Sequence, residues 1–100
     1  MFTQSSAHNS KIAHDHDRAF RIRTRGVKAA GLWAAGQMGL SGDAAQDYAR
    51  ALVLADFEEV GDEDVIAKLR QDLSGVGITE AELRVLLTHC LADAERSLGS

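Results

Sequence analysis

The sequence contains no proline and only one cysteine, Cys90. Because proline breaks helices, its absence favours long, uninterrupted helices. A single cysteine excludes an intramolecular disulfide and favours a reducing, cytoplasmic setting. No apolar run approaches the ~20 residues that cross a bilayer, and none at the N-terminus is typical of a signal peptide. These absences predict one small helical domain that is not inserted in a membrane.

Positive charge is scarce outside the first part of the chain. The net charge is −4, yet residues 1–40 hold six Lys or Arg and two Asp, whereas residues 41–100 hold five Lys or Arg and thirteen Asp or Glu. An acidic chain with few cations in its later helices is a poor nucleic-acid binder, which argues against a helix-turn-helix DNA-binding protein. We expect no nucleic-acid partner and a monomer when the chain is free.

The spacing of apolar residues predicts an all-α, bundle-like fold with four helices and no strands. Short glycine-containing turns favour antiparallel neighbours in a single domain over residues 11–100, although a looser orthogonal packing is an alternative. Residues 1–10 are polar and without pattern, so they are expected to form a disordered tail. The expected helices span residues 11–38, 43–60, 62–74 and 79–98.

The first helix has two unlike halves. From Phe20 onward an apolar stripe predicts that the helix is packed, and Gly31 and Gly36 are expected to be close-packing positions. Residues 11–19 are mostly polar. A helix of this length would be about 42 Å long, and the later helices are too short to cover it. We therefore expect its N-terminal part to project, fray or pack weakly.

Polar residues suited to helix capping precede each later helix. Ser41 or Asp43 can cap the second helix, and Asp62 with the two following acidic residues can cap the third. Thr79 with Glu82 three residues later has the pattern of a capping box. Gly61 is suited to ending the second helix. Trp33 and Cys90 lie on apolar stripes and are expected in the core.

No motif for catalysis or metal binding is apparent, so the chain is expected to be neither an enzyme nor a metalloprotein, with no required cofactor. There is no Gly-rich phosphate loop and no Ser–His–Asp arrangement. His14 and His16 are two residues apart and point to different helical faces. An acidic cluster lacks the spacing of a calcium loop and is interpreted as a solvated edge with helix caps. Its members are Asp56, Glu58, Glu59, Asp62, Glu63 and Asp64.

The basic run at residues 18–28 is the most informative charge feature. Four of its cations follow the spacing i, i+3, i+7, i+10 and so share one helical face: Arg18, Arg21, Arg25 and Lys28. One interpretation is a docking surface for an acidic partner or a phosphate, which makes adenine-nucleotide binding through Arg21, Arg25 and Lys28 an alternative function. The other is that this face pairs within the chain, with the acidic second and third helices.

Several ordered motifs resemble one known family. They are KIAHD at residues 11–15, Phe20 with the Arg-rich run, GLWAA at 31–35, GLSGDA at 39–44, ADFEE at 55–59 and GDEDV at 61–65. Over about residues 11–98 the chain resembles the ATPase inhibitor subunit zeta family of alphaproteobacteria, first catalogued as a domain of unknown function.

The resemblance implies a four-helix, non-enzymatic regulator that binds the catalytic sector of the F-type ATP synthase and limits ATP hydrolysis. It implies a cytoplasmic protein held at the inner membrane through that partner, and an inhibitory N-terminal segment that enters a catalytic interface. For some members it also implies binding of ATP or ADP. The residues expected to contact the partner are Lys11, Ile12, His14, Asp15, Arg18, Phe20, Arg21, Arg25 and Lys28.

The front of the chain departs from the family pattern. Residues 2–10 are almost uncharged where family members carry a charged segment, and Ile12 replaces the usual Phe. We therefore expect the fold to follow the family more closely than the inhibitory potency does.

Overall fold

The computed structural model describes the backbone of residues 2–58 and 61–99 and the side chains of residues 16–58 and 61–98. Within this part of the chain the regular structure is entirely helical, which confirms the expected all-α, four-helix fold. The helices are α1 (Phe2–Gln37), α2 (Gly42–Asp56), α3 (Glu63–Asp72) and α4 (Glu80–Gly99).

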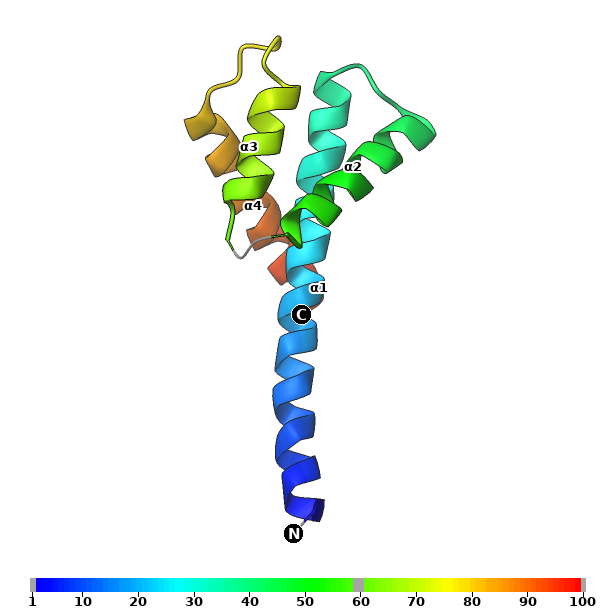
Figure 1. The fold of residues 1–100 in the computed structure, drawn as a ribbon, viewed down its shortest axis with the longest axis vertical. Coiled ribbons are helices and arrows are strands. Elements are labelled where there is room, and N and C mark those ends of the chain that lie inside the picture. Colours follow the sequence, from blue (N-terminus) through cyan, green and yellow to red (C-terminus); the bar gives the residue numbers. More distant parts are fainter. Residues whose placement is uncertain (1, 59–60, 100) are drawn as a thin grey trace.

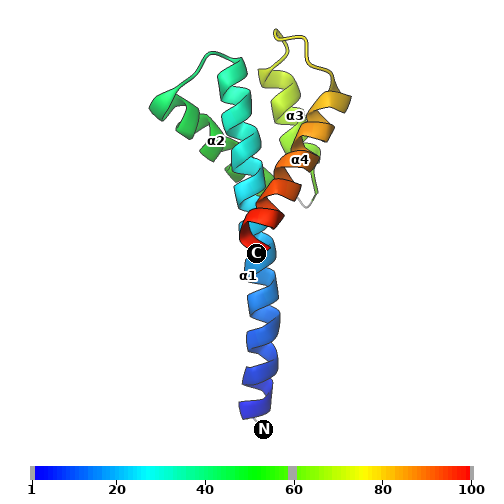
Figure 2. The ribbon, with the colours of Figure 1, turned by 180° about the vertical axis from the view of Figure 1, so that it is seen from behind.

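The bundle is organised around the second half of α1. This half lies between α2 and α4, and α3 packs against those two helices (Figures 1 and 2). Trp33 and Cys90 are partly buried against the core, as expected for apolar-stripe positions. Small and aliphatic residues fill the core: Val27, Ala30, Ala34, Leu52, Val65, Ile66, Leu69, Leu73, Leu83 and Leu87.

The first half of α1 projects beyond the other three helices, as the sequence predicts (Figure 1). A helix of 36 residues is about 54 Å long, and the longest dimension of the molecule is 59 Å. α1 begins at Phe2 rather than near Lys11, because no proline or glycine interrupts the helix-forming residues that precede Gly26. The expected disorder of residues 1–10 stays a prediction.

Two glycines set the distance between α1 and its neighbours. A Cβ atom on Gly26 would lie 2.6 Å from Leu91 Cδ2 and 3.0 Å from Leu91 Cα on α4. A Cβ atom on Gly31 would lie 2.8 Å from Ala49 Cα on α2. Gly31 is therefore the close-packing position that was expected. The same expectation for Gly36 is wrong, because no atom lies within 4 Å of its would-be Cβ.

A polar contact joins α2 to α3. The Tyr48 hydroxyl donates to Asp72 Oδ2 at 2.8 Å, and Lys68 Nζ lies 3.1 Å from the same oxygen. The ammonium group also lies 5.2 Å from the centroid of the Tyr48 ring, within cation–π range. Burial, reinforced by the bond to Asp72, raises the pKa of Tyr48. The phenol is thus held protonated as a donor between the two helices.

The helix ends follow the sequence signals in part. The expected capping box is present, since the Glu82 N–H donates to Thr79 Oγ1 at 3.1 Å and the Thr79 N–H to Glu82 Oε1 at 2.9 Å. The bonds from Thr79 lower the pKa of Glu82. Ser41 occupies the N-cap position of α2 but makes no side-chain capping bond. α2 ends at Asp56, not Val60, because the N–H groups of residues 57 and 58 turn to the carbonyls three residues earlier.

The close approach at Gly31 predicts that Gly31→Ala destabilises the fold. The added methyl meets backbone on α2, and overpacking of this kind costs about 1–3 kcal/mol of unfolding free energy. Gly36→Ala is the matched control on the same helix and should leave stability unchanged or raise it by at most about 1 kcal/mol. Urea unfolding followed by circular dichroism measures both, and equal stability of the two variants would contradict the prediction.

Candidate functional site

Two opposite sides of α1 have different characters. Val27, Ala30 and Ala34 are fully buried and face the core. The four cations at residues 18–28 that share a helical face lie on the other side, and all four are exposed. This set, called the basic face, extends over residues 18–28, ten helical rises and hence about 15 Å along the helix. It consists of Arg18, Arg21, Arg25 and Lys28.

The basic face is largely unneutralised by the described part of the chain. Of its four cations only Arg21 has an ion pair there, with Asp17 one turn earlier at 3.9 Å. Both side chains of that pair are mostly exposed, and such pairs contribute little. The interpretation that this face pairs with the acidic helices α2 and α3 is therefore wrong, and the positive field of the face is directed to solvent.

Arg23 makes the inward ion pairs instead. Its Nε lies 3.1 Å from both carboxylate oxygens of Asp56, and its Nη2 lies 2.6 Å from Asp56 Oδ1. Its Nη1 donates to Asp62 Oδ1 at 2.6 Å, and Nη2 also donates to the Gly61 carbonyl at 3.1 Å. The hydrogen bonds that Arg23 donates to Asp56 outweigh burial and raise the pKa of Arg23. One guanidinium thus joins α1 to the end of α2 and the start of α3.

This network changes the interpretation of the acidic cluster. The Asp56 side chain is only 7% exposed, so it is not part of a solvated edge. Asp62 occupies the N-cap position of α3 but makes no capping bond, because its carboxylate is turned to Arg23. Sequence spacing missed Arg23, since it lies off the basic face among other arginines. Its position four residues before Val27, on the same helical face, was the available signal.

An exposed apolar patch lies beside the Arg23 network. The rings of Phe20 and Phe57 stack with centroids 5.6 Å apart and an interplanar angle of 20°, but they remain 54% and 52% exposed. Leu54, three residues before Phe57 on α2, is 59% exposed. The expectation that Phe20 belongs to the packed stripe is therefore wrong in part, because the buried core of α1 begins about two turns later, at Val27. We call Phe20, Leu54 and Phe57 the apolar patch.

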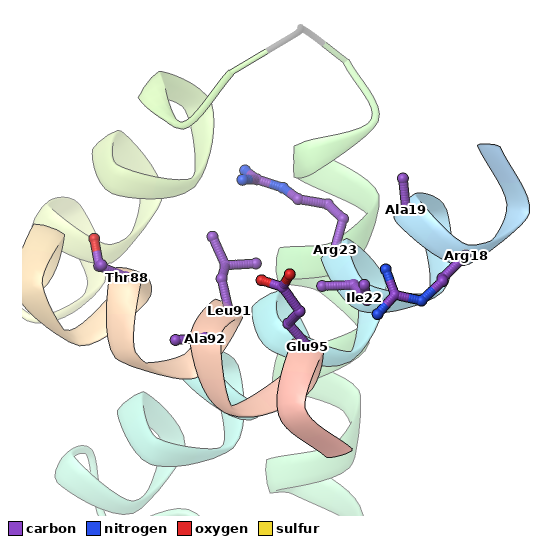
Figure 3. Close-up of a pocket in the computed structure, with 8 residues that line it drawn as sticks. All are labelled: Arg18, Ala19, Ile22, Arg23, Thr88, Leu91, Ala92 and Glu95. Carbon is purple, nitrogen blue, oxygen red and sulfur yellow. The ribbon is translucent and has the colours of Figure 1, made fainter. Parts of the chain in front are cut away.

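A groove runs between α1 and α4 close to where α1 leaves the bundle (Figure 3). Its volume is about 700 Å³. Ile22 on α1 and Leu91 on α4 supply apolar lining, whereas Arg18 and Glu95 supply charges of opposite sign from the two helices. This end of the basic face is therefore continuous with a partly apolar surface.

A smaller recess of about 170 Å³ lies between α1 and α2. Lys28 from the basic face lines it, together with Thr24, Gln46, Arg50 and Val53. Thr24 Oγ1 is buried and has no hydrogen-bond partner in the structure. Arg21 and Arg25 do not line this recess, so the three residues expected for phosphate binding do not converge on it.

The expected partner-binding residues at the front lie on the projecting half of α1. Lys11, Ile12, His14 and Asp15 fall within the helix, but their side chains lie outside the described residues. Among the described side chains, no group of three or more His, Cys, Asp or Glu residues is placed to hold a metal ion. None of the helices in the described chain is both long and apolar enough to cross a membrane.

Comparison with known proteins assigns the chain to a family. The model of the family described as ATPase inhibitor subunit zeta matches residues 2–97, nearly the whole chain. The chain belongs to this family. The match includes the front segment as well as the bundle, and the family is named for an inhibitor subunit rather than for an enzyme.

A solved structure supports the same fold. It carries the description "Solution NMR structure of the protein", is 44% identical to this chain and has a TM-score of 0.72. The alignment covers 79% of this chain and 92% of that one. Among the curated proteins, none matches the chain at a significant level.

The Arg23 network predicts a clear difference between neighbouring arginines. Arg23→Gln leaves the nearly buried Asp56 without its cation and should lower the unfolding free energy by about 1–3 kcal/mol. Arg25→Gln, on the exposed basic face, should change it by no more than about 0.5 kcal/mol. Thermal and urea unfolding of both variants tests this, and an Arg25→Gln effect as large as that of Arg23→Gln would refute it.

Proposed function

We propose that the chain is a non-enzymatic regulator that binds the catalytic sector of the F-type ATP synthase and limits ATP hydrolysis. Membership of the ATPase inhibitor subunit zeta family supports this function. The observation that carries it is the projection of α1, a helix whose first half extends past a compact bundle. In the proposal, residues 2–19 enter a crevice of the partner while the bundle stays outside.

A projecting helix can act as an inhibitory element only if its base is held firmly. Three contacts do this: the Arg23 ion pairs, the approach of Gly26 to Leu91, and the approach of Gly31 to Ala49. Because the base of the helix is already ordered, less conformational entropy is lost when its tip binds. In the proposal, the bundle thus holds the base of α1 in place and orients the N-terminal segment toward the partner.

The basic face supplies the proposed docking electrostatics. Four exposed cations within one helical face attract an acidic protein surface and increase the rate of encounter. Because the face is exposed, added salt should screen this attraction. In this proposal the chain is a cytoplasmic protein that reaches the membrane only through its partner, with no direct insertion.

The direct test is ATP hydrolysis by the cognate catalytic sector in the presence of excess protein. The full chain should inhibit, and a chain lacking residues 2–15 should not, because most of the inserting segment (residues 2–19) is removed while the described bundle is kept. Arg25→Glu should weaken binding by about tenfold or more, through loss of a cation and like-charge repulsion. Arg70→Glu on α3, where Arg70 is 61% exposed, is the matched charge-reversal control.

Two outcomes would contradict the proposal. The first is the absence of binding and inhibition by the full chain at saturating concentration. The second is equal inhibition by the full chain and by the chain lacking residues 2–15, because the projecting half would then be dispensable.

A second candidate function is recognition of a nucleotide phosphate. The recess between α1 and α2 is lined by Lys28, by Arg50, which also pairs with Asp47 at 3.1 Å, and by Thr24, whose hydroxyl has no partner. Cationic and hydroxyl donors of this kind suit a phosphate oxygen. Cofactor binding of this kind is compatible with the regulatory function, because the recess lies away from the projecting segment.

Titration with ATP and with ADP, followed by amide and methyl NMR shifts, tests this second function. Shifts should concentrate at Thr24, Lys28 and Val53 and should disappear in Lys28→Gln. Lys68→Gln on α3 is the control that should leave them unchanged. Absence of localised shifts at saturating nucleotide would exclude the recess as a phosphate site.

A further inference from the structure

We propose that the apolar patch, Phe20 with Leu54 and Phe57, is a second contact surface for the partner that the basic face binds. The occupant we assign to it is an apolar side-chain cluster on that partner, flanked by Lys or Arg. This inference rests on the proposed function, because it extends the contact surface around the base of the projecting helix.

The patch is unlike a set of scattered surface hydrophobics. Single exposed apolar residues are common and need no explanation. Here two aromatic rings from different helices stack on each other and still leave about half of each ring in water. Leu54 adds a third exposed side chain one helical turn from Phe57. Adjacent, exposed aromatic and aliphatic groups are the composition of an interface centre.

The patch is continuous with the proposed insertion segment. Phe20 lies on α1 directly after residues 2–19, and its neighbours Ala19 and Ile22 line the groove between α1 and α4. A partner that encloses α1 as far as Arg18 needs only one further half-turn of helix, about 3 Å, to reach Phe20. The Phe20 ring stacks directly on the Phe57 ring. The interface therefore continues from α1 to the C-terminal end of α2 without a gap.

The charges around the patch determine the chemistry of the occupant. Both signs of charge lie near the patch in sequence: Arg21 follows Phe20 and pairs with Asp17, whereas Glu58 follows Phe57 and is exposed. The other cations near the patch are also paired within the chain, Arg23 with Asp56 and Asp62 and Arg50, one turn before Leu54, with Asp47. Among these described charges Glu58 alone is without an ion pair, and Lys or Arg side chains of a partner complement it.

The basic face and the apolar patch lie on different sides of α1 and thus require different chemical groups on the partner. The basic face is complemented by carboxylates, whereas the apolar patch is complemented by apolar groups with cations nearby. A crevice between two segments of the partner that differ in charge meets both needs, and a uniformly acidic surface does not. The patch would then set the rotation of α1 within the crevice.

The arrangement is also rigid before binding. Arg23 fixes the last residue of α2 to α1 through Asp56, and this holds the Phe57 ring against Phe20. A preformed aromatic pair loses little rotamer freedom when it is covered, which favours affinity.

The test is the affinity of the full chain for the cognate catalytic sector, measured by biolayer interferometry. Leu54→Ser should raise Kd by about tenfold or more, as expected for a central interface residue. Val85→Ser on α4 is the matched control, since Val85 is 57% exposed and lies on a different helix. Its Kd should match that of the unsubstituted chain. Leu54 is outside the ring stack, so thermal unfolding should show that both variants keep the fold.

A second variant tests the charge of the occupant. Glu58→Lys should weaken binding more at low salt than at high salt, because it opposes the cations of the partner. Equal affinities for the unsubstituted chain, Leu54→Ser and Glu58→Lys would overturn the proposal for the patch and leave the proposed function intact. Failure of the unsubstituted chain to bind would overturn both.

A further outcome distinguishes the other possible occupant. If the unsubstituted chain sediments as a dimer at high concentration and Leu54→Ser sediments as a monomer, the patch is covered by a second copy of this chain. That result would overturn the assignment to the partner.

Discussion

The position of α1 within the molecule depends on one guanidinium group. Arg23 donates to Asp56 at the end of α2 and to Asp62 at the start of α3, so a single side chain fixes three elements. Apolar contacts alone do not set such a register, because hydrophobic burial is non-directional. Since Asp56 is almost buried, loss of the cation would leave an uncompensated charge rather than a missing surface contact. The projecting helix therefore has a defined exit point.

Small residues make this ion pair geometrically possible. Gly26 and Gly31 allow α4 and α2 to approach the backbone of α1 on two sides, and alanines continue that face toward Ala34. With α1 held this closely against α2 and α4, its opposite side is exposed at Arg18, Arg21, Arg25 and Lys28. The basic face is exposed for that reason. The same close packing that stabilises the bundle thus presents four cations to a partner.

The sequence predicted what depends on local periodicity and local chemistry. The four helices, the Thr79–Glu82 capping box, the Gly31 contact and the projection of the first helix all follow from spacing. The sequence could not predict, in the same way, which of several similar residues in the basic run faces the interior and which faces solvent. Which arginine turns inward depends on how α2 ends in space, and the exposure of Phe20 depends on where the neighbouring helices stop. The expected partner contacts of the side chains before residue 16, including His14, remain predictions.

The contacts at the base of α1 explain how a small bundle can hold a long projecting helix in place. Force or binding at the tip of α1 is transmitted along the helix to its base, where sliding must break the hydrogen bonds of Arg23 as well as displace Phe20 from Phe57. Rotation about the helix axis would bring Gly26 away from Leu91 and place a larger side chain in its position. Both motions are therefore opposed by contacts of residues 20–26, within about two turns of helix. A helix held in this way can present a basic side and an apolar side to different parts of a partner at the same time.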